Sequence, residues 1–210
     1  MIVSFNFYYA RPGQQDAVLR QRLRACEVRQ DLGIPRGRVL SRITGATALP
    51  DVIWEHRFED VGGHHADMAV RAASPEFEAI RAGMRELCRR FERPLFEVCT
   101  TAAGNDTVPV PGIVTLDWIF CSPEKTEKVL AALDQPAGRH VQQGYNGGQL
   151  LRLITPADDL PGLVWRRDYP DIASHDRVQA EMAYRSEQQA WPARINALAQ
   201  RVEHSLWQRI

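Results

Sequence analysis

The chain has 210 residues, 44% of them hydrophobic, so it can form one large domain or two small ones around a buried core. Its 26 acidic and 26 basic residues balance, which excludes a global charge that would favour nucleic acid or an anionic membrane as a partner. The N-terminus lacks the pattern of a secretory signal, and no apolar run approaches the roughly 20 residues that span a bilayer, so we expect a cytoplasmic protein.

The first predicted element is a β-strand over residues 2–9, in which apolar and polar side chains alternate and the odd positions form a strongly apolar face. Residues 14–31 place Leu19, Leu23 and Cys26 on one side of a charged segment, which predicts an amphipathic helix. Apolar residues at helical spacing interrupt the arginines of this segment. We therefore interpret these arginines as a solvated helix face and not as a nucleic-acid site.

Two further strands are predicted over residues 38–44 and 51–60, and their short connection of Gly, Ala, Thr and Pro suits a hairpin. A helix is predicted over residues 74–92, where Ser74 is a candidate cap and a proline occupies the first turn. Its apolar stripe consists of Phe77, Ile80, Met84, Leu87 and Phe91. A last strand over residues 93–99 completes the order βαββαβ, which is the ferredoxin-like arrangement.

The second half of the chain repeats the first. A shift of 111 residues superimposes residues 2–99 on residues 113–210 without a gap. It keeps glycine, proline and tryptophan in register at Gly37/Gly148, Pro50/Pro161 and Trp54/Trp165. We predict an internal tandem duplication, with a first unit at 1–100, a linker at 101–112 and a second unit at 113–210. In the second unit, Pro136 is expected to end or kink the first helix early.

The third strand and the segment after it carry a run of Trp54, Phe58, Asp60 and His64, and the long helix beginning "ASPEF" follows. Together they resemble the dimeric α/β-barrel superfamily, and within it the NIPSNAP-like and antibiotic-biosynthesis-monooxygenase-like branches. The resemblance implies an α+β fold of two tandem ferredoxin-like βαββαβ units. Their antiparallel sheets would pair into an intramolecular α/β barrel, as a monomeric pseudo-dimer or a homodimer.

The same resemblance implies a function. It points to a small-molecule enzyme, namely a cofactor-independent monooxygenase or a related cyclase or isomerase that acts on an apolar or aromatic substrate. The alternative is a non-catalytic ligand-binding or interaction protein that uses the same barrel. The resemblance is a pattern of fold and core positions and not a catalytic signature, so each candidate site residue is considered separately.

His64 and Asn6 are the candidate catalytic residues of the first half, and the shift matches them to His175 and Asp117. One interpretation is that His64 belongs to the start of a short helix that Asp60 caps. The other is that it enters the cleft between sheet and helices as an acid or base. Asn6 and Asp117 lie in mid-strand, where a polar side chain is disfavoured unless it is hydrogen-bonded or functional.

Four further residues are candidates for substrate binding. If their strand face lines a cavity, Tyr8, Trp54 and His56 would form an aromatic pocket with one titratable group. In the second half, Arg167 replaces His56 and would give a more polar site together with Asp117. The alternative is that they are rim residues and that Trp54 belongs to the core.

Cofactor and metal sites are predicted to be absent, with haem as the alternative that the resemblance raises. In haem-degrading members of the superfamily, an Asn from the first strand and a His near the following helix meet in the pocket, and Asn6 and His64 match that pair. The Trp that those enzymes carry on this helix has no counterpart here. The histidines and the four cysteines lack the spacing of a metal site, so free thiols are expected.

Overall fold

The computed structural model describes residues 1–101, 112–142, 148–155, 157, 159–183 and 193–210. The chain divides into two compact units. Unit 1 contains Met1–Arg42, Thr47–Phe96 and Ile210, and unit 2 contains Ile43–Ala46 and Glu97–Arg209. The boundary after Phe96 thus falls a few residues before the predicted one, and nearly all of the predicted linker at 101–112 lies outside the described residues.

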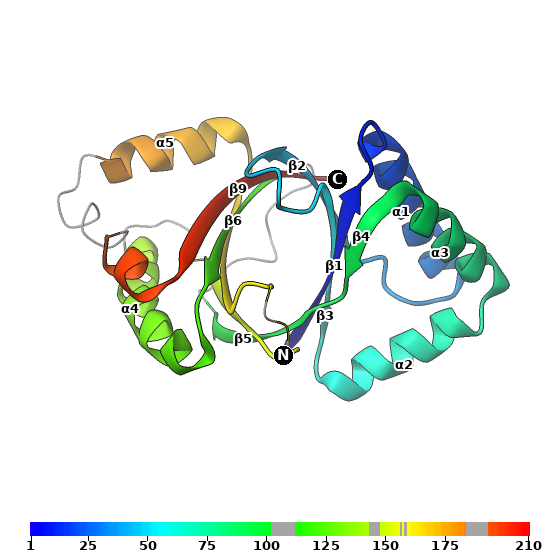
Figure 1. Cartoon of the computed structure of the whole chain (residues 1–210), viewed down its shortest axis with the longest axis horizontal. Coiled ribbons are helices and arrows are strands. Elements are labelled where there is room, and N and C mark those ends of the chain that lie inside the picture. The colour runs from blue at the N-terminus through cyan, green and yellow to red at the C-terminus, as the bar shows by residue number, and fades with distance from the viewer. Residues whose placement is uncertain (102–111, 143–147, 156, 158, 184–192) are drawn as a thin grey trace. The chain divides into compact units, whose positions relative to one another are not determined.

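In unit 1, an antiparallel sheet has the strand order β2-β3-β1-β4. Its strands are β1 (Ile2–Ala10), β2 (Arg38–Thr44), β3 (Val52–Phe58) and β4 (Cys88–Glu92), and β5 (Leu95–Thr101) follows directly. The helices are α1 (Gln15–Asp31), α2 (Val61–Ala72) and α3 (Pro75–Leu87). They lie on one side of the strands, with α1 and α3 next to each other (Figure 1). The fourth strand of this order is Cys88–Glu92 and not the predicted last strand at residues 93–99.

Unit 2 has the equivalent strand order, β7-β8-β6-β9. Its strands are β6 (Gly112–Phe120), β7 (Gln149–Leu153), β8 (Leu163–Tyr169) and β9 (Arg201–Arg209), and its helices include α4 (Pro123–Gln142) and α5 (Ile172–Ala183). The register is also equivalent: Asn6 faces Trp54 across β1 and β3, and Asp117 faces Trp165 across β6 and β8. The same shift of 111 residues relates the pairings of the neighbouring strands.

One predicted helix is too long. α3 ends at Leu87, and Cys88 already belongs to β4, so Phe91 lies on a strand and not on the helix stripe. There it stands opposite Tyr8 of β1, with the ring centroids 5.0 Å apart. Pairing with β1 satisfies the backbone of this segment and outweighs its helical pattern.

Of the two effects predicted for Pro136, an early end of the helix or a kink, the early end is wrong, because α4 continues to Gln142. The turns before the proline are held by Val129 and Leu133, which are fully buried in a cluster with Trp165. A proline removes one helical hydrogen bond, but its fixed φ is close to the helical value. Packing on the N-terminal side therefore permits the helix to pass through it.

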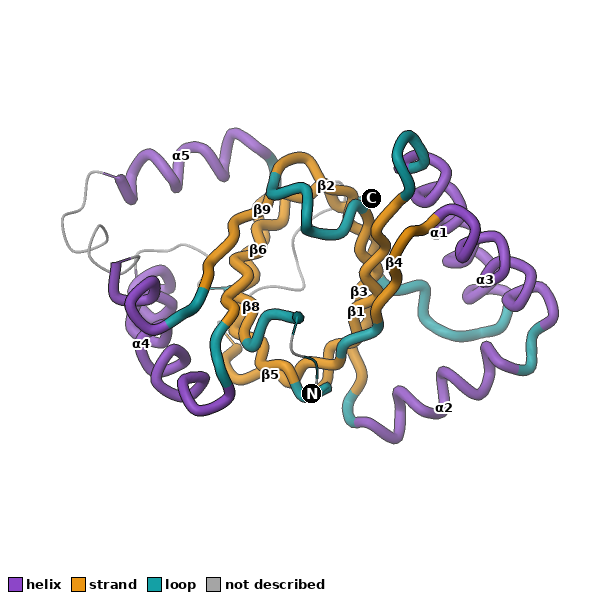
Figure 2. The backbone as a smooth tube through the Cα atoms, viewed as in Figure 1, coloured by secondary structure: helices purple, strands orange, loops and turns teal. Residues whose placement is uncertain are grey.

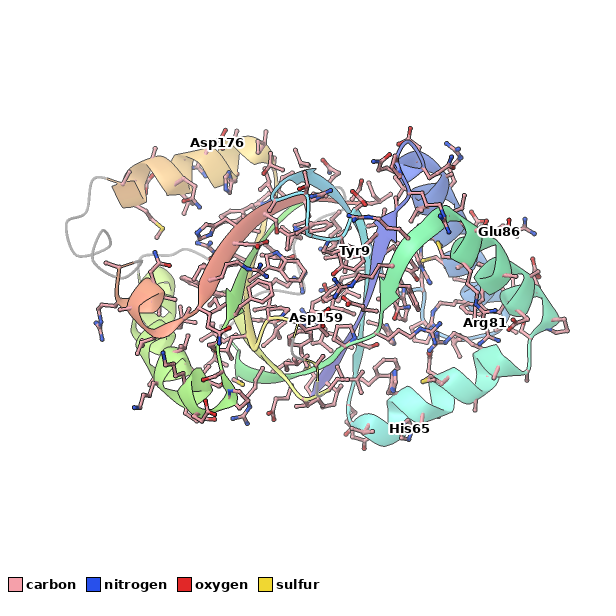
Figure 3. The ribbon with its side chains drawn as sticks, in the orientation of Figure 1. Tyr9, His65, Arg81, Glu86, Asp159 and Asp176 are labelled. Carbon is pink, nitrogen blue, oxygen red and sulfur yellow. The ribbon has the colours of Figure 1, made fainter. Side chains whose placement is uncertain are left out.

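The two faces of each sheet have different surroundings, and helices cover one of them (Figure 2). In unit 1, Tyr8 and Ala10 share a buried cluster with Val18 of α1 and Met84 of α3, so the even positions of β1 face the helices. The odd positions lie on the other face, as Tyr9 does in Figure 3. The apolar face predicted for residues 2–9 therefore points away from the helices, and the polar positions Ser4 and Asn6 point toward them.

Gly37 permits the chain to enter β2 closely against the core. Its φ is +74°, and a Cβ at this position would lie 2.3 Å from Nε1 of Trp54. Gly148 has φ +77° at the start of β7 and would bring a Cβ to 2.7 Å from Nε1 of Trp165. Only glycine accommodates both the positive φ and the close approach. In both units, a tryptophan side chain thus packs closely against a glycine.

Candidate functional site

A pocket with a volume of about 70 Å³ lies in unit 1 between the sheet and its helices. Asn6 and Tyr8 of β1 form its polar wall. Its apolar wall comes from the helices and β4. Five arginines complete the lining: Arg22, Arg71, Arg81, Arg85 and Arg93. No lining residue is an Asp, Glu or His. The pocket therefore offers cations and hydrogen-bond donors, and no carboxylate or imidazole base.

The hydroxyl of Tyr8 is the centre of the polar wall. Nδ2 of Asn6 donates to Oη of Tyr8 over 3.3 Å, and Nη1 of Arg22 donates to the same oxygen over 3.2 Å. All three side chains are buried. Because the oxygen accepts both bonds, and no described residue accepts the hydroxyl hydrogen, Tyr8 can donate that hydrogen to a ligand. The structure thus joins two of the predicted site residues, Asn6 and Tyr8.

Trp54 lies beneath this wall and does not line the pocket. The guanidinium carbons of Arg22 and Arg29 each lie 4.6 Å from the centroid of its ring, and its Nε1 donates to the carbonyl oxygen of Arg36 over 3.0 Å. The side chain is 1% exposed and belongs to the core cluster of unit 1. Its position matches the core interpretation, and its face supports two arginines through cation–π contacts.

A buried ion-pair network fixes Arg71, which lines the pocket, and Arg29, which does not. The carboxylate of Asp67 of α2 accepts from Nη2 and Nη1 of Arg29 over 2.5 and 3.1 Å, and it forms an ion pair with Nε of Arg71 at 2.8 Å. Burial alone would raise the pKa of Asp67, but the hydrogen bonds from Arg29 and the charge of Arg71 lower it below its usual value. Asp67 therefore remains a carboxylate and holds α2 against α1.

His56 and His64 lie outside the lining of the pocket. The ring of His56 stacks on Trp54 with centroids 5.7 Å apart. Burial and the charge of Arg29 lower the pKa of His56 to about 4, so it is neutral near pH 7. The ring of His64 packs edge-on against Phe58 at 5.2 Å, and burial, then the charge of Arg71, lowers its pKa.

His64 occupies the first turn of α2, where the carboxylate of Asp60 accepts from the backbone N–H of Gly63 over 2.8 Å. In unit 2, His175 has the same place in α5. Asp171 accepts from the N–H of Ser174 over 2.7 Å, and the His175 ring packs edge-on against Tyr169 at 5.2 Å. The repeated histidine thus has the same capped turn and the same aromatic neighbour in both units.

In unit 2, Asp117 forms a charged cluster that the sequence indicates only in part. One carboxylate oxygen accepts from Nη2 of Arg167 over 2.7 Å, and the other lies 2.7 Å from Nδ1 of His204. Arg167 also lies over the ring of Trp165 at 4.4 Å. The hydrogen bond with Asp117 raises the pKa of His204, whose side chain is 67% exposed. Arg167 was predicted and His204 was missed, although β9 places it directly opposite Asp117.

Metal and haem sites can be tested on the same geometry. Among the described residues, no group of three or more His, Cys, Asp or Glu is placed to hold a metal ion. The Asn–His pair that the resemblance associates with haem is not brought together, because His64 does not line the pocket with Asn6. The lining contains no His or Cys to serve as an axial ligand, so it does not fit haem in that way.

No helix in the described ranges combines the length and apolarity needed to cross a membrane.

Comparisons with known proteins identify relatives by structure and not by sequence. No protein-family model matches the chain, and no curated protein matches it. An anthrone oxidase-like protein matches with a TM-score of 0.64 at 13% identity. The match covers 100% of this chain and 90% of that protein. A putative monooxygenase from Lactobacillus acidophilus has a TM-score of 0.60 at 13% identity, with 99% and 93% covered. Another from Fusobacterium nucleatum has a TM-score of 0.62 at 9% identity, with 99% and 91% covered. At these identities the likeness establishes the fold alone.

Proposed function

We propose, from the dimeric α/β-barrel fold that this chain shares with those structures, that it is a small-molecule enzyme of the monooxygenase or related cyclase and isomerase kind. The pocket of unit 1 is its substrate site. The observation that carries this proposal is the Tyr8 hydroxyl, which accepts from Asn6 and Arg22 and can donate its hydrogen to a ligand in a pocket with one apolar wall. Such a pocket suits an aromatic or apolar molecule with one polar oxygen.

Tyr8 acts in this proposal by donating a hydrogen bond to a carbonyl or phenolic oxygen of the substrate. When the substrate loses a proton from a carbon conjugated with that oxygen, negative charge develops on the oxygen and the bond from Tyr8 strengthens. Arg22 and Asn6 stabilise the charge that shifts onto the Tyr8 oxygen. The proton passes to water at the pocket mouth, since the lining holds no carboxylate or imidazole.

The oxygenation then needs no bound cofactor, because the substrate supplies the electrons. A methylene compound R₂CH₂ reacts with O₂ through its carbanion to a hydroperoxide, which loses water to give R₂C=O. One O₂ is consumed and one H₂O is released for each substrate. His64 and His175 take no part in this proposal; each holds the capped first turn of its helix.

A non-catalytic ligand-binding protein is the second candidate. The observation that favours it is the lack of a side-chain base among the residues that line the pocket. The two functions differ in oxygen consumption: a binding protein is stabilised by its ligand and leaves dissolved O₂ unchanged.

The test follows O₂ consumption and product mass with anthrone and smaller enolisable aromatic ketones as probes. Tyr8→Phe is expected to lower kcat by about 10²-fold, because it removes one donor to the developing oxyanion. Tyr9→Phe is the matched control, since Tyr9 lies on the opposite face of the same strand and donates to Glu92. Equal activity of the two variants would overturn the site assignment. Binding without O₂ uptake would select the second candidate.

We further infer that the two units descend from one ancestral unit by duplication. The shared shift of 111 residues in all three strand pairings supports this, as does the match of α2 (Val61–Ala72) with α5 (Ile172–Ala183). Duplication releases one copy from the constraint of keeping a working pocket, so unit 1 and unit 2 are free to differ.

A further inference from the structure

Arg22 is a buried cation without a carboxylate partner. Its side chain is 3% exposed, and its hydrogen bonds go to the neutral groups of Tyr8 and Cys26. Its Nε is buried and has no hydrogen-bond partner among the described residues. Arg29, two turns further along α1, is 0% exposed and fully paired with Asp67. A buried charge is unfavourable unless an opposite charge accompanies it, so Arg22 lacks a counter-ion.

Two of the other lining arginines are paired, Arg71 with Asp67 and Arg81 with Glu78, but these pairs leave Arg22 itself without a counter-ion. Arg85 and Arg93 also line the pocket, and no described acidic side chain forms an ion pair with either of them. Partial burial lowers the pKa of Arg93, and the guanidinium groups of Arg81, Arg85 and Arg22 lower it further. These like charges repel one another across the cavity, and an anion placed between them would relieve the repulsion.

Unit 2 indicates that the fold does not need Arg22. Val18 and Val129 are both fully buried at matching positions of α1 and α4. Four residues later, unit 1 has Arg22 where unit 2 has Leu133, which packs in the core with Ile119 and Ile195. A leucine is therefore sufficient to pack the helix on the sheet. An arginine at this place is better explained by a ligand than by packing.

We propose that the pocket of unit 1 binds the carboxylate of a small aromatic or apolar organic acid, with Arg22 as the buried counter-charge. This rests on the proposed function, because it names the substrate class of the same pocket. The planar guanidinium of Arg22 matches a carboxylate, and the Tyr8 hydroxyl stays available to the carbonyl or phenolic oxygen of the same substrate. Phe77, Ile80 and Met84 contact the hydrocarbon part, and Arg85 and Arg93 attract the acid to the mouth.

The experiment compares benzoate with benzamide, which have nearly the same shape and differ in charge. Isothermal titration of the full chain at low salt is expected to show benzoate binding about tenfold tighter or more, and raising the salt is expected to weaken benzoate alone. In Arg22→Leu, which reproduces the residue of unit 2, the two affinities become equal. Arg24→Gln is the matched control, because Arg24 is an exposed residue of the same helix that pairs with Glu76. This control keeps the wild-type preference.

A mouth variant protects the test against misfolding of Arg22→Leu. Arg93→Gln is expected to reduce the benzoate preference about threefold, since the charge of Arg93 is more exposed and more screened than that of Arg22.

Equal binding of the two probes to the wild type overturns the carboxylate proposal and leaves the pocket as a ligand site. An unchanged preference in both arginine variants also overturns it. Failure of both probes to bind contradicts the carboxylate proposal and the substrate site together. Arginine-dependent benzoate binding in a protein inactive toward the ketone probes supports the carboxylate site and contradicts the enzyme.

Discussion

Unit 1 and unit 2 have the same strand register, but different kinds of side chain lie between each sheet and its helices. In unit 2, the described residues between sheet and helix include a packed cluster that contains Ile119, Leu133 and Ile195. In unit 1, the first two of these positions hold Tyr8 and Arg22, and a pocket lies beside them. The sheet therefore does not decide whether this layer is closed or open. A few side chains on the strand and the helix decide it.

The units also differ in how they balance charge on the same strand position. In unit 2 this position is Asp117, whose carboxylate pairs with Arg167 and His204 in the middle of the sheet. The matching residue of unit 1 is Asn6, which is neutral and bonds Tyr8. Unit 2 thus satisfies its cations internally, whereas unit 1 leaves Arg22 for an external anion.

The largest effect on stability is expected at the buried ion pairs of unit 1. Asp67→Ala would leave the buried Arg29 and Arg71 without a counter-charge and is expected to lower the free energy of unfolding by about 3–5 kcal/mol. Chemical denaturation measures this. Glu76→Ala is the control, because its pair with Arg24 is exposed and is expected to contribute under about 1 kcal/mol. A loss below about 1 kcal/mol for Asp67→Ala would show that the network does not hold α2 against α1.

A smaller effect of opposite sign is expected when unit 1 is made to resemble unit 2. Arg22→Leu replaces an unpaired buried charge by the apolar residue of unit 2 and is expected to raise the free energy of unfolding by about 1–2 kcal/mol without ligand. The thermal unfolding midpoint gives an independent measurement. A destabilised variant would mean that the contacts of Arg22 with Tyr8 and Trp54 outweigh its missing counter-charge.

The smallest effect concerns the charge cluster of unit 2. In an NMR titration, His204 is expected to titrate above 6.5, because the hydrogen bond with Asp117 raises its pKa. Asp117→Asn, which copies the residue of unit 1, is expected to remove that shift. His56 serves as the internal reference, since its pKa of about 4 has other causes. An unchanged His204 titration in the variant would exclude Asp117 as the cause.

These two histidines make opposite contributions to stability as pH changes. The raised pKa of His204 gives stabilisation that is present below pH 6.5 and is lost as pH rises through the raised value. The lowered pKa of His56 gives stabilisation that is present above pH 6.5 and is lost as pH falls toward about 4. The contribution of His204 is small because its side chain is 67% exposed and solvent screens the pair.

The sequence was sufficient to predict the first three strands of unit 1 and their counterparts in unit 2, because alternating or short apolar runs mark them at matching places in the two halves. It was not sufficient to place the end of α3, since the helical pattern of residues 88–92 is overridden by pairing with β1. It also did not reveal that His64 is outside the pocket. Both residue pairs, Asn6/Asp117 and His64/His175, repeat equally well, and repetition does not separate a packing role from a chemical one.

The arginines of residues 14–31, Arg22 and Arg29 among them, were interpreted as a solvated helix face, although one signal argued against that. Arg22 lies four residues after Val18 and four before Cys26, so it falls on the buried side of α1. The shift also matches it to a leucine. Whether such an arginine turns inward depends on partners far along the chain, here Tyr8 for Arg22 and Asp67 for Arg29, and local periodicity does not contain them.

Trp54 lies between two guanidinium groups, and this position has an optical consequence. Indole emission responds to nearby charge, and the Arg22 and Arg29 side chains each lie 4.6 Å from this ring. Arg29 is held by Asp67, so Arg22 is the neighbour whose charge a bound acid would neutralise. Unit 1 thus contains its own fluorophore next to the proposed counter-charge, and the intensity or wavelength of its emission would report occupancy without any label.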